Sequence, residues 1–196
     1  MSKVVTRRNA MIAGAIVLLG VAPTVYMRAT SGFPPDTTPE GAYLRVALAV
    51  GEDKLVDAFA YLETESQWAC FSLFDYERRA YDVVAGSYPE PERARLLAQY
   101  RDAHESATGQ ELFARLARSR GWSARLRKDL SGIGRVETSG ERATVETTRG
   151  TRYPFRRREN GIWGLTMFTG ELREAAQRAA RDFSVVEKAA RDYAAK

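Results

Sequence analysis

The chain has 196 residues, 44% of them hydrophobic and 10% aromatic, which is enough apolar material for one globular domain and excludes a largely disordered chain. Four of the five net positive charges come from the first 29 residues, which hold four basic residues and no acid, so the rest of the chain is nearly neutral and does not favour a nucleic-acid partner. The single cysteine, Cys70, excludes an intramolecular disulfide and a cysteine zinc site, and its apolar neighbours predict a buried thiol.

The first expected element is an apolar helix over residues 10–27, a stretch of 18 residues without charge. A helix of that length rises about 27 Å, just enough to cross a hydrocarbon core of about 30 Å. Lys3, Arg7 and Arg8 precede it, and the positive-inside rule then leaves the N-terminus in the cytoplasm. We therefore expect residues 1–28 to be a signal-anchor that crosses the cell membrane once, with the remaining chain outside the cytoplasm, in the periplasm if the cell is Gram-negative.

Other interpretations of this segment stay open. A cleaved signal peptide needs small residues of the A-x-A type at its cleavage site, and residues 22–24 and 27–29 match that pattern poorly. Residues 6–9, Thr-Arg-Arg-Asn, resemble the start of a twin-arginine export signal, although Ala10 and Met11 stand where Phe and Leu are usual. A buried helix of a cytoplasmic protein does not explain why basic residues come first and apolar residues second.

A linker over residues 29–38 leads into a series of expected helices. Thr38, Pro39 and Glu40 are typical of a helix start, and Gly51 closes the helix that follows. Apolar spacing, with Gly and Pro residues as boundaries, predicts further helices over residues 53–62, from a Thr64 cap to about residue 85, over 91–103 and over 110–119.

Alternating residues replace helical spacing after Gly132. Turn signals at Ser139-Gly140, Arg149-Gly150 and Asn160-Gly161 separate runs that should form an antiparallel meander over residues 135–138, 142–148, 151–158 and 162–168. In the last run Trp163 should face inward with Leu165 and Met167. A final helix should run from Gly170 to about residue 190. The sequence thus predicts one soluble α+β domain over residues 39–196, with N-terminal helices packed on a curved antiparallel sheet and an extra C-terminal helix.

This order of elements resembles the NTF2-like superfamily. The resemblance covers residues 38–168 and rests on two phrases: Pro39-Glu40-Gly41-Ala42, which is similar to the first helix of exported members, and Asn160-Gly161-Ile162-Trp163, which turns into the last strand. It implies a cone-shaped roll whose mouth can hold a ligand or an active-site carboxylate, although many members are only binding or structural modules. The C-terminal helix would be an addition to that roll.

Few residues could carry catalysis. His104, the only histidine, lies in a polar stretch and is expected at the surface. The NTF2-like resemblance implies a carboxylate in the cone, and Asp75 and Asp82 are the candidates, but i,i+4 pairs with Arg79 and Arg78 give them a structural role instead. The sequence holds no phosphate-binding glycine loop, serine elbow or metal-ligand cluster, so we expect no cofactor and no metal.

The charge layout is the most unusual feature of the sequence. Residues 30–114 carry an excess of acid and residues 115–196 an excess of base. The bases gather in two clusters, one over 115–128 and one over 149–158. In the second cluster, alternation places Tyr153 and Phe155 toward the core and Arg152, Arg156 and Arg158 together on the opposite face. These three arginines are the candidate binding residues, for anionic lipid, an anionic polymer or an acidic protein partner, unless the acidic half of the domain neutralises them.

These observations favour a membrane-anchored accessory domain outside the cytoplasm, which binds or supports other molecules without catalysis. The alternative is an NTF2-like enzyme of hydrolase or isomerase type that uses a carboxylate in its cone. A filled concave face of the sheet would count against that alternative, and an apolar cavity that holds Asp75 or Asp82 would favour it.

Overall fold

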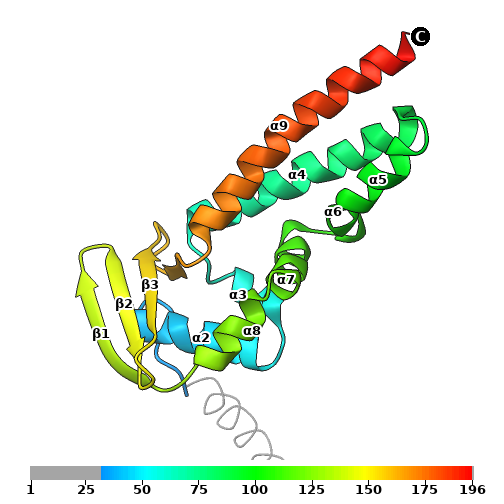
Figure 1. The fold of residues 1–196 in the computed structure, drawn as a ribbon. Coiled ribbons are helices and arrows are strands. Elements are labelled where there is room, and N and C mark those ends of the chain that lie inside the picture. Colours follow the sequence, from blue (N-terminus) through cyan, green and yellow to red (C-terminus); the bar gives the residue numbers. More distant parts are fainter. Residues whose placement is uncertain (1–31, 196) are drawn as a thin grey trace, which may run out of the picture. The chain divides into compact units, whose positions relative to one another are not determined.

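The computed structural model describes residues 32–195 (Figure 1). Helices come first, a sheet follows, and one long helix ends the chain. The first helices are α2 (Pro39–Gly51), α3 (Leu55–Phe59), α4 (Thr64–Ser87), α5 (Glu92–Gln99), α6 (Arg101–Glu105), α7 (Gly109–Ser119) and α8 (Trp122–Asp129). The strands are β1 (Ile133–Ser139), β2 (Arg142–Thr147), β3 (Arg152–Arg157) and β4 (Trp163–Leu165), and α9 (Thr169–Ala194) is the last helix. The α+β class is therefore confirmed.

Within the described residues the strands form one antiparallel sheet in the order β1-β2-β3-β4, as the meander predicted. Each connection contains a glycine with a positive φ: Gly140 at 58°, Gly150 at 80° and Gly161 at 83°. Residues with side chains avoid this conformation, so these positions explain why the three turn signals were correct.

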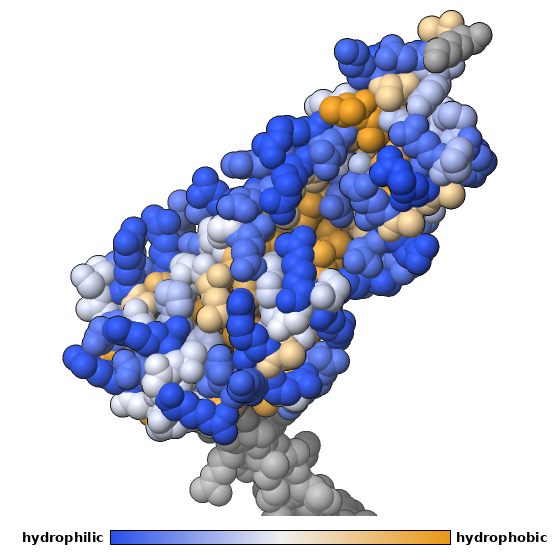
Figure 2. Space-filling model, in the orientation of Figure 1, coloured by the Kyte–Doolittle hydropathy of each residue, from blue (hydrophilic) through white to orange (hydrophobic). Residues whose placement is uncertain are grey.

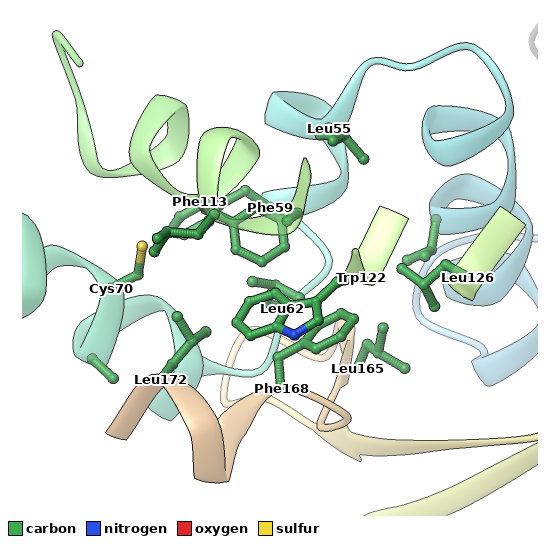
Figure 3. Close-up of a cluster of buried hydrophobic side chains, with 14 of the residues drawn as sticks. Leu55, Phe59, Leu62, Cys70, Phe113, Trp122, Leu126, Leu165, Phe168 and Leu172 are labelled. Carbon is green, nitrogen blue, oxygen red and sulfur yellow. The ribbon is translucent and has the colours of Figure 1, made fainter. Parts of the chain in front are cut away.

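The face of the sheet that packs on α2 is filled with side chains. Tyr43 of α2 lies against Tyr153 of β3, with ring centroids 5.3 Å apart. Trp122 of α8 stacks on Phe168 at 4.7 Å, and Figure 3 shows these rings closely packed with Leu165 and its neighbours. We call this packed region, with α2, α3, α7, α8 and the sheet, the body of the domain.

The long helices α4 and α9 run parallel to each other and extend away from the sheet (Figure 1). We call their distal halves, together with α5, the helical arm. The arm has an apolar cluster of its own, made of Ala80, Val84, Tyr88, Leu96, Tyr100, Phe183, Val186 and Ala190. In Figure 2 apolar surface appears mainly as a narrow band along the arm, between hydrophilic residues, as expected for helices that bury only one face each.

The helix predictions hold with local corrections. Thr38 caps α2 by accepting a hydrogen bond from the Gly41 amide at 3.1 Å, as predicted. Thr64 is not a cap: Glu63 holds that position, and α4 begins at Thr64. The helix expected over residues 91–103 breaks at Tyr100, whose ring turns into the arm cluster, and gives α5 and α6.

Two further elements differ from expectation. Helix α8 was not predicted, although Trp122 and Leu126 are four residues apart and are both buried on one side of it. The last strand ends at Leu165, because Phe168 already holds the cap position of α9 and Met167 is half-buried. Trp163 and Leu165 face the core, which confirms that part of the prediction.

No helix within residues 32–195 is long and apolar enough to cross a bilayer. The expected membrane segment over residues 10–27 lies outside the described part of the chain.

Candidate anion-binding site

The connection between β3 and β4 is a tight turn built by Asn160 and Gly161. The Gly161 amide donates to the Arg158 carbonyl oxygen at 2.9 Å, and the Arg158 amide donates to the Ile162 carbonyl oxygen at 2.9 Å. The Asn160 side chain accepts from the Ile162 amide at 3.1 Å. These bonds fix the end of β3, where three arginines follow one another in sequence.

A second segment is held against this turn by the smallest residue of β4. The amide of Glu63 donates to the Leu165 carbonyl oxygen at 3.1 Å, and the Leu165 amide donates to the Tyr61 carbonyl oxygen at 2.7 Å. A Cβ on Gly164 would lie 2.5 Å from the Cα of Glu63, so only glycine permits this approach. The start of α4 is thereby placed beside the β3–β4 turn.

These two segments, together with Glu141 of the β1–β2 turn, line a partly open cavity of about 870 Å³, which we call the arginine groove. Its lining consists of Glu63, Thr64, Glu65, Trp68, Glu141, Arg156, Arg157, Arg158, Glu159 and Asn160. Two of the three predicted binding residues, Arg156 and Arg158, therefore lie at one site, together with Arg157.

Two of the carboxylates in the groove already have partners. Glu63 is only 5% exposed, and its carboxylate accepts a hydrogen bond from the Thr169 hydroxyl, which lies 2.7 Å from the Ser66 hydroxyl. Glu65 forms an ion pair with Arg173 of α9 at 3.1 Å. Neither carboxylate is left to neutralise the arginines.

Arg158 does not lie on the outer face of the sheet, so that part of the prediction is wrong. It follows the end of β3, and its guanidinium donates to the Ala60 carbonyl oxygen at 2.8 Å and to the Gln67 side chain at 3.4 Å. Both acceptors are neutral, and the Nε–H of Arg158 is buried with no hydrogen-bond partner among the described residues. The charge of Arg158 is therefore held in place without being neutralised.

Arg156 and Arg157 are exposed, and neither forms an ion pair or a side-chain hydrogen bond with any other residue in the range 32–195. Arg142 of β2 lies directly opposite Arg156 in the sheet. Like charges in this cross-strand position repel, which destabilises the pair unless an anion lies between them.

Arg152, the third predicted binding residue, lies at the other end of β3 and outside the groove. Its guanidinium contacts Glu137 at 3.2 Å and Glu146 at 3.7 Å, and Arg135 contacts Glu137 at 3.1 Å. The acids come from β1 and β2, not from the acidic N-terminal half. Arg152 thus belongs to a neutralised network within the sheet.

Three members of the other basic cluster, over residues 115–128, are neutralised by the acidic half of the domain, as the neutralisation hypothesis predicted. Asp53 forms ion pairs with Arg118 and Arg127, both at 3.2 Å, and Glu105 pairs with Arg115 at 2.9 Å. These contacts join the acidic and basic halves of the domain. They leave the arginine groove as the clearer candidate for an external anion.

The residues considered for catalysis do not form a site. Asp75 lies on the exposed side of α4 and pairs with Arg79 at 3.4 Å, as expected, whereas Arg78 stacks on Phe74 instead of pairing with Asp82. His104 is exposed and stacks on Tyr81 at 3.7 Å. Residues 32–195 contain no group of three metal-binding side chains.

The face of the sheet that packs on α2, where an NTF2-like cone would hold its carboxylate, is packed and apolar. Burial raises the pKa of Tyr153 on this face to about 12, and within the described chain its hydroxyl has no hydrogen-bond partner. The Cys70 thiol is buried too, as predicted: burial raises its pKa to about 12, and Sγ donates to the Gly109 carbonyl oxygen at 3.2 Å.

Sequence reasoning missed one unusual carboxylate, Glu77 of α4. It lies between the body and the arm, on the face of α4 that carries Cys70, Leu73, Ala80 and Val84. Burial raises the pKa of Glu77 to about 7; Arg120 lowers it in part, and Asp102 and Asp182 raise it further. The signal was present in the sequence, because Glu77 continues the 3-4 spacing of that buried face.

No protein-family model, curated protein or solved structure matches the chain. The site must therefore be interpreted from its own geometry.

Proposed function

We propose that residues 39–196 form a non-catalytic binding domain, and that the arginine groove holds an anionic group of its partner. The observation that carries this proposal is the isolation of Arg156 and Arg157, which line a cavity without an acidic partner in the described part of the chain. Several other exposed arginines of the domain are paired with carboxylates, as Arg118 and Arg152 are.

Guanidinium groups suit this role because they bind carboxylate and phosphate oxygens through two parallel hydrogen bonds. A single exposed ion pair contributes only about 0–1 kcal/mol, so one arginine would not hold a ligand. Two free guanidinium groups beside the fixed charge of Arg158 can act together on one anionic group, and such binding should weaken as salt increases.

The proposal also covers the fold of the domain and its cellular location. We propose that the domain is a variant of the NTF2-like roll, supported by the helix that precedes the antiparallel meander and by the Asn160–Trp163 turn into the last strand. In this variant α4 and α9 pack on each other instead of on the sheet. We propose that residues 1–28 anchor the chain in a membrane, with the domain outside the cytoplasm.

The binding proposal is tested with the full-length chain in neutral detergent. Polyphosphate, a polyglutamate peptide and polygalacturonate are titrated at about 50 mM and about 300 mM salt. At least one should bind in a salt-dependent manner, and Arg156→Gln with Arg157→Gln should weaken that binding at least about tenfold, equivalent to about 1.4 kcal/mol.

Arg152→Gln is the matched control, because it removes an arginine of the same strand that already has acidic partners. Binding should change less than about twofold in this variant. An equal loss in both variants, or no binding of any probe, would overturn the proposed site.

The address is tested separately. A reporter that is active only outside the cytoplasm, fused after residue 196, should be active, and the full-length chain should sediment with membranes. Recovery of a soluble chain that begins near residue 29 would show cleavage and contradict the anchor.

A further inference from the structure

The lining of the arginine groove carries free charges of both signs. Arg156 and Arg157 have no acidic partner in residues 32–195, and in the same range Glu141 and Glu159 have no basic partner. A ligand that is negative along its whole length, such as polyphosphate, would meet these two carboxylates as well as the arginines. A ligand with widely spaced charges avoids that repulsion.

Hydroxyl groups that lie between the anionic groups of a ligand would donate hydrogen bonds to the carboxylates of Glu141 and Glu159. A carboxylate accepts hydrogen bonds from neutral donors, and hydrogen bonds to charged groups contribute about 1.5–3 kcal/mol each. Thr64 and Asn160 add neutral polar groups to the lining. The groove therefore suits a ligand that alternates anionic groups with hydroxyls.

Trp68 supplies a flat apolar surface in this groove. It is 66% exposed. A tryptophan that a partner covers contributes more binding free energy than most residues do. Phe71, one helical turn further along α4, supports it edge-on, with ring centroids 6.3 Å apart at 71°. A ring in this position can pack against the C–H face of a pyranose while the arginines contact its acid group.

The size of the groove agrees with an extended ligand. Its volume of about 870 Å³ lies near the upper end of the roughly 300–1,000 Å³ typical of ligand sites, and is far larger than one inorganic ion requires. We infer that the arginine groove binds a short stretch of acidic polysaccharide with about one carboxylate per sugar. This inference rests on the proposed function and names the class of anion.

The test uses the full-length chain in neutral detergent. Trp122 and Trp163 are buried, and the chain has three tryptophans, so Trp68 dominates any change in tryptophan emission that a surface ligand causes. Trigalacturonate should change this emission, and Trp68→Phe should abolish the change. Neutral maltotriose should have no effect, and tripolyphosphate should bind at least about tenfold more weakly than trigalacturonate.

Calorimetry measures affinity independently of fluorescence. Trp68→Ala should weaken trigalacturonate binding at least about fivefold, without a change in melting temperature, because the ring is exposed. If tripolyphosphate binds more tightly than trigalacturonate, and Arg156→Gln with Arg157→Gln abolishes this binding, the inference of a polysaccharide ligand is wrong. The proposed anion site would still stand. If no anion binds through these arginines, both proposals fail.

Discussion

The two ends of strand β3 carry the same residue type in different electrostatic surroundings. At the start of the strand, Arg152 lies between Glu137 and Glu146. At its end, Arg156 faces Arg142 across the sheet, and Arg157 has no ion-pair partner among residues 32–195. The number of arginines in a segment therefore does not give its free charge, because the neighbouring strands decide which guanidinium groups remain available.

The largest loss of stability should come from replacing Trp163, which supports the end of β3 that carries the unpaired arginines. Trp163 of β4 pairs with Arg157, is 5% exposed and donates from Nε1 to the Thr37 carbonyl oxygen at 3.1 Å. Trp163→Ala should destabilise the domain by about 3–5 kcal/mol in denaturant titration, because it leaves a large cavity and an unpaired carbonyl. A loss below about 1 kcal/mol would show that the indole contributes little to the core.

A smaller structural effect is expected from Gly164→Ala. The new Cβ would lie within 2.6 Å of two backbone atoms of Glu63, which cannot move as a flexible side chain could. We expect a loss of about 2–3 kcal/mol together with weaker anion binding, because the two walls of the groove would separate. Gly170→Ala is the control, since no atom lies within 4 Å of its added Cβ. Equal stability of both variants would contradict the close approach.

Buried carboxylates show the same difference between charged groups with and without a partner. Glu63 accepts a hydrogen bond from the Thr169 hydroxyl, whereas Glu77, with a pKa raised to about 7, has no hydrogen bond or ion pair within the described chain. Folding therefore favours protonated Glu77. Its stabilising contribution is complete below about pH 4.5 and is lost as the pH rises toward about 7.

Glu77→Gln should consequently stabilise the domain by about 1–2 kcal/mol at pH 8 and by almost nothing at pH 4. Thermal or denaturant unfolding at both pH values measures this difference. Asp75→Asn, an exposed change on the same helix, should show no such gain at pH 8. A gain that is equal at both pH values would mean that ionisation of Glu77 is not its cause.

The smallest effect compares the two ends of the sheet directly. Arg142→Thr should stabilise the domain by about 0.2–1 kcal/mol, because it removes the like charge opposite Arg156. Arg152→Gln should have the opposite sign and a similar size, because it removes two exposed ion pairs. Denaturant midpoints at low salt should resolve the difference, and two changes of the same sign would contradict it.

Local chemistry made much of the fold predictable. The Thr38 cap and the three glycine turns depend on residues next to each other in sequence, so single-sequence reasoning located them. The break at Tyr100 depends on a cluster formed with Phe183 of α9, which lies far away in the chain. Helix α8 was missed because its basic residues obscured the buried pair Trp122 and Leu126.

The site was predictable only in part, because its contacts also join residues that are far apart in sequence. Alternation placed Arg152 and Arg156 on one face correctly, but the rule ends where the strand ends, and Arg158 lies beyond β3. The partners of Arg152 and Arg156 depend on strand register, which no local pattern in β3 specifies. Trp68 faces solvent in the groove although it is a large apolar residue, and no local pattern in α4 separates it from the buried residues of that helix.

The parallel arrangement of α4 and α9 has a consequence for synthesis. Ser66 and Thr169, at the starts of the two helices, are 103 residues apart in sequence, and α9 follows the sheet. At about 5–20 residues per second, the ribosome exposes the apolar face of α4 for roughly 5–20 s before its partner exists. A chain interrupted before α9 would keep Ala80 and Val84 uncovered, so proteolysis should remove such incomplete chains sooner than complete ones.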